Sequence, residues 1–74
     1  MDNKTKLLKI LNDINPDIDY EKEKSLVENG VFDSLEVMTL VTELEMRFHI
    51  EIDPDDVTAE NFNSVETMLA LIEK

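Results

Sequence analysis

Apolar residues recur at the spacing of an α-helix in three segments of this chain, and this periodicity constrains the fold more than any other feature. The segments cover residues 7–14, 37–48 and 65–72, and in each the apolar positions share one helical face. The one stretch that alternates like a strand, residues 50–52, is too short to form a sheet. We therefore predict an all-α fold in a single domain spanning residues 1–74, a small bundle of three main helices plus one short helix.

Start and stop signals set the expected helix boundaries. Asp2 or Asn3 begins the first helix, and Asn15 ends it because a residue before proline disfavours helical backbone. The second helix is expected at residues 34–48 and the short helix near residues 58–62.

Capping patterns mark the two later main helices. Asp33 with Glu36 forms a capping-box pair at the start of the second helix, and Asn63 with Glu66 is expected to do the same for the last. Residues 18–32 lack any period and are predicted to form a long loop after the first helix, with at most one short helical turn in its middle. A loop of this length in so small a domain is often functional.

The chain is strongly acidic, with 18 Asp and Glu residues against 7 Lys and Arg and a net charge of −11. This charge repels nucleic acid and anionic membranes and favours encounter with basic protein surfaces. The absence of cysteine and the single histidine exclude thiol chemistry and the common zinc sites. No apolar run has the length of a transmembrane helix or the pattern of a signal peptide. We expect a cytoplasmic monomer that neither binds nucleic acid nor inserts into a membrane.

Ser34 has no catalytic constellation around it. His49 lies at the far end of the same expected helix, roughly 22 Å along its axis, too far to serve as a general base. The residues around Ser34 also lack the flanking glycines of a nucleophile elbow. The chain is therefore predicted not to be an enzyme, with no catalytic residue and no metal ligand.

The second helix has an unusual outer side, because residues opposite its apolar stripe are apolar or neutral where charges are normal. These residues are Leu35, Thr39, Thr42 and Met46, with Met38 on the flank and Glu36, Glu43 and Arg47 along one border. An apolar ridge beside acidic residues predicts a docking surface for a partner protein. Two alternatives stay open: the ridge consists of scattered surface residues, or the long loop covers it.

The tripeptide Asp33-Ser34-Leu35 resembles the phosphopantetheine attachment motif of the acyl carrier and peptidyl carrier protein family. Residues 28–36, the exit of the second helix at 48–52 and the start of the last helix at 63–65 also resemble this family. The resemblance extends over essentially the whole chain, including its length and acidity.

The resemblance implies that Ser34 receives a 4′-phosphopantetheine arm from coenzyme A, in a reaction catalysed by a separate phosphopantetheinyl transferase. Asp33 and Leu35 complete the motif that meets the transferase. The arm is expected to hold acyl intermediates as thioesters, as in fatty acid or polyketide biosynthesis. A loading ligase for acyl or aminoacyl groups and downstream synthases or transferases with basic docking surfaces are the further implied partners. Together with the ridge, the resemblance implies docking at Glu36, Met38, Thr39, Thr42, Glu43, Glu45 and Met46.

The second helix departs from typical fatty-acid carriers. Glu36 stands where those carriers have Asp, Thr39 and Met46 stand where they tend to have acids, and Arg47 reverses a charge. We therefore predict a dedicated set of partners and not the general fatty-acid synthase enzymes.

Two other functions stay open. Val31 and Phe32, just before the motif, are also similar to the D-alanyl carriers of cell-wall teichoic acid and to other aminoacyl or peptidyl carriers. From another class, the chain could be an unmodified acidic adaptor that binds a basic protein partner.

A carrier that shelters its cargo needs a cavity, which we expect between the second and third helices. Methionine in its lining would suit a cargo that comes and goes. The alternative is that the same residues simply fill the core. They are Leu40, Leu44, Ile52, Phe62 and Met68.

Overall fold

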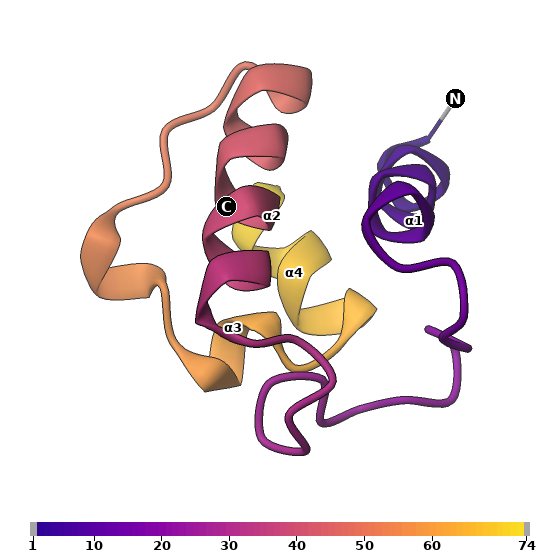
Figure 1. Ribbon diagram of the computed structural model, residues 1–74. Coiled ribbons are helices and arrows are strands. Elements are labelled where there is room, and N and C mark those ends of the chain that lie inside the picture. Colours follow the sequence, from indigo (N-terminus) through magenta and orange to yellow (C-terminus); the bar gives the residue numbers. More distant parts are fainter. Residues whose placement is uncertain (1, 74) are drawn as a thin grey trace.

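The computed structural model describes residues 2–73, and all regular structure in that range is helical. The elements are α1 (Asn3–Ile14), α2 (Ser34–Phe48), the 3₁₀ turn η1 (Pro54–Asp56), α3 (Ala59–Phe62) and α4 (Val65–Ile72). Helix α1 packs against α2 and α4, and α3 packs against α4 (Figure 1). The segment between α1 and α2 passes below both helices, and α3 lies beside the N-terminal end of α2 (Figure 1). The predicted all-α fold of three main helices and one short helix is confirmed.

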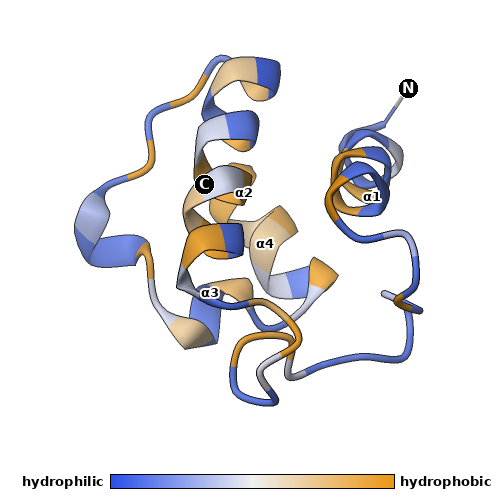
Figure 2. Cartoon of the chain, viewed as in Figure 1, coloured by the Kyte–Doolittle hydropathy of each residue, from blue (hydrophilic) through white to orange (hydrophobic). Residues whose placement is uncertain are grey.

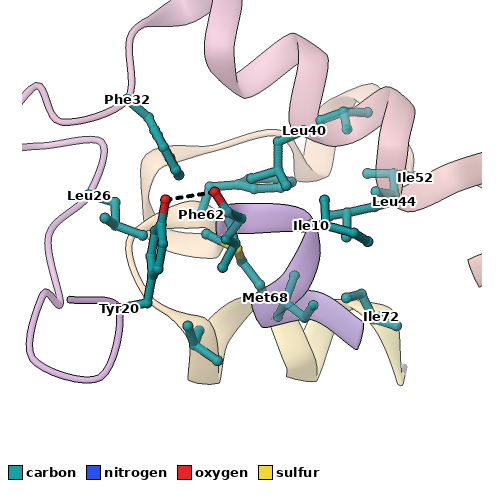
Figure 3. Close-up of a cluster of buried hydrophobic side chains, with 14 residues drawn as sticks. Ile10, Tyr20, Leu26, Phe32, Leu40, Leu44, Ile52, Phe62, Met68 and Ile72 are labelled. Atoms are coloured by element: carbon teal, nitrogen blue, oxygen red, sulfur yellow. Dashed lines mark hydrogen bonds between the residues drawn. The ribbon is translucent and has the colours of Figure 1, made fainter. Parts of the chain in front are cut away.

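The apolar faces of the helices meet in one core. Figure 2 shows the hydrophobic side of α1 turned toward α2 and α4. Figure 3 shows that the long loop also contributes to this core, through Tyr20, Leu26 and Phe32. The helices and the segment after α2 supply the other buried apolar side chains, namely Leu7, Ile10, Leu11, Leu40, Val41, Leu44, Ile52, Phe62, Val65, Met68 and Ile72.

The residues expected to line an acyl cavity fill the core instead. Leu40, Leu44, Phe62 and Met68 are each 0% exposed, and Ile52 is buried beside them. Side chains packed to this extent leave little room for a cargo. The alternative reading of these five residues, as core packing, is the one that the structure favours.

Two of the three expected caps are correct and one is wrong. The Asp2 carboxylate accepts the backbone N–H of Thr5 at 2.8 Å and begins α1. The cap of α4 is Ser64, which forms a capping box with Thr67, so the prediction of Asn63 and Glu66 was wrong. The side chain of Asn63 is bonded to Val27 and Glu28 in the loop before α2, so it does not cap α4.

The long loop is built from hydrogen-bonded turns and contains no helix. The N–H of Asn29 donates to the carbonyl of Ser25 at 2.8 Å, and the N–H of Phe32 donates to the carbonyl of Leu26 at 2.9 Å. Between them Gly30 has a φ of 74°, a backbone conformation that side chains other than glycine rarely adopt. These turns bring the chain back to the core immediately before α2.

Tyr20 fastens the first half of this loop to α1. Its hydroxyl lies 2.9 Å from the carbonyl oxygen of Leu11 and 2.7 Å from that of Asn15, two acceptors that share its proton (Figure 3 shows the first). Its ring packs against Phe32 with 6.1 Å between centroids. Burial of the phenol, with a further contribution from the charge of Glu36, raises the pKa of Tyr20 to about 12.

None of the helices within residues 2–73 has the length and apolar character needed to cross a bilayer.

The Tyr20 contacts predict a specific loss of stability at alkaline pH. The neutral phenol is favoured in the folded state, so its contribution is complete below pH 10 and lost as the pH rises to about 12. Urea unfolding across this range should show a decline in wild type that is smaller in Tyr20→Phe. At neutral pH the same variant should be less stable by about 1 kcal/mol, because it lacks the hydroxyl. Parallel pH profiles for the two proteins would contradict this role.

Candidate functional site

The candidate site is the start of α2, which is set by a reciprocal capping box. The Asp33 carboxylate accepts the N–H of Glu36 at 2.9 Å, and the Glu36 carboxylate accepts the N–H of Asp33 at 3.3 Å. Asp33 itself has extended backbone, so Ser34 is the first residue of the helix. Ser34 is therefore not the cap, and its hydroxyl is not needed for that role.

Ser34 and Leu35 are exposed at this helix start, and Leu35 is 78% exposed. The first backbone N–H groups of a helix have no acceptor within it, and the peptide dipoles add partial positive charge there. The Asp33 carboxylate accepts the N–H of Glu36. The backbone N–H groups of Ser34 and Leu35 lie at the N-terminal end of the helix. A phosphate attached to Ser34 is electrostatically favoured at this position.

A pocket of about 460 Å³ opens beside Ser34. Three parts of the chain form it: the loop before α2, the first turn of α2 and the segment that leads into α3. Its lining residues are Val27, Gly30, Phe32, Asp33, Ser34, Val37, Met38, Val57, Thr58 and Ala59. The pocket is mainly apolar and lies closer to the helix start than the cavity expected from the sequence.

The expected separation of Ser34 from His49 is confirmed. His49 is exposed at the opposite end of α2, where it closes the helix in a left-handed conformation with a φ of 55°. Within residues 2–73 no three His, Asp or Glu side chains are grouped so that they could hold a metal ion.

The outer side of α2 is an exposed ridge, which the long loop does not cover. Met38 is 57% exposed and Met46 66% exposed, in line with Leu35 at the helix start. The hydroxyls of Thr39 and Thr42 donate to the carbonyls of Leu35 and Met38, four residues earlier, at 3.0 and 3.1 Å. Because these hydroxyls are turned back onto the helix, the threonines add methyl groups to the ridge.

The acidic residues expected to dock partners already have partners in the chain. Glu43 forms an ion pair with Arg47 at 3.1 Å, and Glu36 belongs to the capping box. Glu45 accepts the N–H of Ile52 at 2.9 Å and so holds the segment that follows α2. The structure therefore presents the ridge mainly as an apolar surface with partly neutralised charges at its border.

Comparison with known proteins identifies the family. The sequence profile described as "Phosphopantetheine attachment site" matches residues 5–72. The chain belongs to this family of phosphopantetheine-dependent carriers. Proteins of the family bear a covalently attached 4′-phosphopantetheine group. A curated relative, the "D-alanyl carrier protein" of Leuconostoc mesenteroides subsp. mesenteroides, is 30% identical over 74 residues, which cover 99% of this chain and 95% of the relative. No solved structure matches the chain significantly.

Sequence reasoning missed two features of this candidate site. It did not place Val57, Thr58 and Ala59 beside Ser34, because only the folded chain brings them there. It also read Asn63 as a helix cap, whereas Asn63 is buried and bonded to the loop before α2. The only sequence signal for this role of Asn63 was its position directly before the Ser64-x-x-Thr67 capping box, which leaves its side chain free of the capping role.

The capping box predicts how the start of α2 responds to substitution at Asp33. Asp33→Ala removes the acceptor for the Glu36 N–H and should lower the free energy of unfolding by about 1 kcal/mol. Asp33→Asn keeps an acceptor oxygen and should retain most of that stability. Urea unfolding of the two variants checks this, with Asp55→Ala in η1 as a control for removing one negative charge. Equal losses in the Asn and Ala variants would show that the charge matters and not the hydrogen bond.

Proposed function

We propose that this chain is a carrier whose Ser34 bears the 4′-phosphopantetheine arm and holds a substrate on it as a thioester. The single observation that supports this most is the position of Ser34, exposed as the first residue of α2 beside the Asp33–Glu36 capping box. Membership of a phosphopantetheine-bearing family supports this assignment. The arm carries the substrate to partner enzymes, and the chain itself catalyses no step.

Attachment of the arm is a phosphoryl transfer to the Ser34 hydroxyl. The serine oxygen forms a bond to the phosphorus of the pantetheine phosphate in coenzyme A. The bond to the departing adenosine 3′,5′-bisphosphate breaks, and the serine proton passes to a base of the transferase. A partner has to bring that base, since His49 lies at the opposite end of α2.

The relative that is a D-alanyl carrier protein supports an aminoacyl cargo as the second candidate. The pocket beside Ser34, at about 460 Å³, has room for a small group at the end of the arm. The family is defined by the arm and not by what the arm holds, so we keep a generic acyl cargo as the broader, first candidate.

Partner enzymes dock on the ridge of α2 formed by Leu35, Met38, Thr39, Thr42 and Met46. Apolar side chains supply the contact area, and the net charge of −11 on the chain as a whole favours the approach of basic partners. We place this work in the cytoplasm and assign it to a monomer.

Intact mass after incubation with coenzyme A, magnesium and a broad-specificity phosphopantetheinyl transferase tests the proposal. Wild type should gain one phosphopantetheine, and Ser34→Ala should gain none. Of the two further serines, Ser64 caps α4, so Ser25→Ala serves as the matched control and should still be modified. A folded wild type that gains no mass would favour the unmodified adaptor instead.

Substitutions on the exposed ridge should weaken docking of the transferase without lowering the stability of the fold. Leu35→Ala and Met46→Ala should each lower kcat/KM for the transferase by about tenfold, because they remove exposed contact area. Both should change the free energy of unfolding by less than about 0.5 kcal/mol. Lys9→Ala, which alters an exposed residue of α1, is the control and should leave both quantities unchanged. Transfer rates that are insensitive to both ridge variants would place the docking surface elsewhere.

A further inference from the structure

Asn63 is a buried polar residue at the junction of α3 and α4, and its bonds lead away from both helices. It is 8% exposed. Its side-chain oxygen accepts the N–H groups of Val27 at 3.0 Å and Glu28 at 3.1 Å. Its side-chain nitrogen donates to the Glu28 carboxylate at 2.7 Å, and its main-chain carbonyl accepts the N–H of Leu26 at 2.9 Å. All four bonds therefore reach the loop that precedes α2.

The segment that Asn63 holds is the base of the turn leading into Ser34. The carbonyl of Leu26 accepts the N–H of Phe32 at 2.9 Å, which closes the loop just before Asp33 and Ser34. Leu26 and Phe32 are both buried, so the two ends of this loop are anchored in the core. A residue that fixes Leu26 and its neighbours therefore also fixes how the chain enters α2.

The same residue joins the two walls of the pocket beside Ser34. Val27 and Gly30 line it from the loop, while Thr58 and Ala59 line it from the start of α3. Asn63 directly follows α3 and bonds to Val27, so it sets the spacing between these walls.

We propose that Asn63 is a positioning residue for Ser34, which holds the preceding loop in the shape that the phosphopantetheinyl transferase recognises. This inference rests on the proposed attachment at Ser34 and adds a determinant outside the motif. Asn63 is not among the residues that line the pocket beside Ser34; it acts through Leu26, Val27 and Glu28.

An amide is required at this position because it must accept and donate at once. An aspartate would still accept the two N–H groups but would place its carboxylate against that of Glu28. A glutamine at residue 28 would restore a donor to such an aspartate. Asn63→Asp should therefore loosen the loop, and Glu28→Gln should rescue it while having little effect alone.

The test measures kcat and KM of a broad-specificity transferase for the unmodified protein, with amide hydrogen exchange at Val27 and Glu28 as a second readout. Asn63→Asp should lower kcat/KM by about tenfold, mainly through KM, and speed exchange at both amides. The double variant Asn63→Asp with Glu28→Gln should recover most of kcat/KM and most of the protection of the two amides from exchange. Ile10→Val, which weakens the core on α1, controls for lost stability and should leave kcat/KM unchanged.

Unchanged kcat/KM in a folded Asn63→Asp protein, or an equal fall in Ile10→Val, would overturn the inference while leaving attachment at Ser34 intact. If Asn63→Asp does not fold, Gly30→Ala disturbs the same loop from a position with open space around it and a φ of 74°. It should also raise KM, and an unchanged KM there would likewise overturn the inference. A wild type that accepts no arm would refute the proposed function and this inference together.

Discussion

The fold depends on how the non-helical segment between α1 and α2 is held against the helices. In a chain of 74 residues this segment cannot supply its own core, and its backbone groups need partners. Tyr20 ties its first half to the end of α1, and Asn63 ties its second half to the α3–α4 junction. Leu26 and Phe32 complete the attachment by burial. The start of α2, and with it Ser34, takes its position from these anchors.

The two sides and the first turn of α2 have different roles as a result of this arrangement. One side is committed to the core through Leu40, Val41 and Leu44, while the opposite side stays exposed and apolar. The first turn presents a serine that the capping box leaves available. A carrier needs these three properties together: a stable helix, an accessible attachment point and a surface that partners can recognise.

Local signals predicted the helices well, because periodicity, Pro16 and the Asp33 cap act over a few residues. The start of α2 was predictable for the same reason. The hydrogen bonds of the Asn63 and Glu45 side chains could not be predicted in this way. The partners of Asn63 lie 35 and 36 residues away in the sequence and the partner of Glu45 lies seven residues away, so both sets of bonds depend on the path of the loops. The pocket beside Ser34 likewise required the tertiary structure, because α3 supplies part of it. The prediction of an acyl cavity between the helices was wrong because core packing depends on side-chain contacts that the periodicity of the sequence does not specify.

Site-resolved fragmentation mass spectrometry of the chain isolated from the cells that make it tests the central claim most directly. The account predicts one phosphopantetheine group, located on Ser34, with Ser25 and Ser64 unmodified. A group on any other residue would contradict the assignment of the site. A chain that carries no such group in the cell, although folded and expressed, would contradict the carrier function itself.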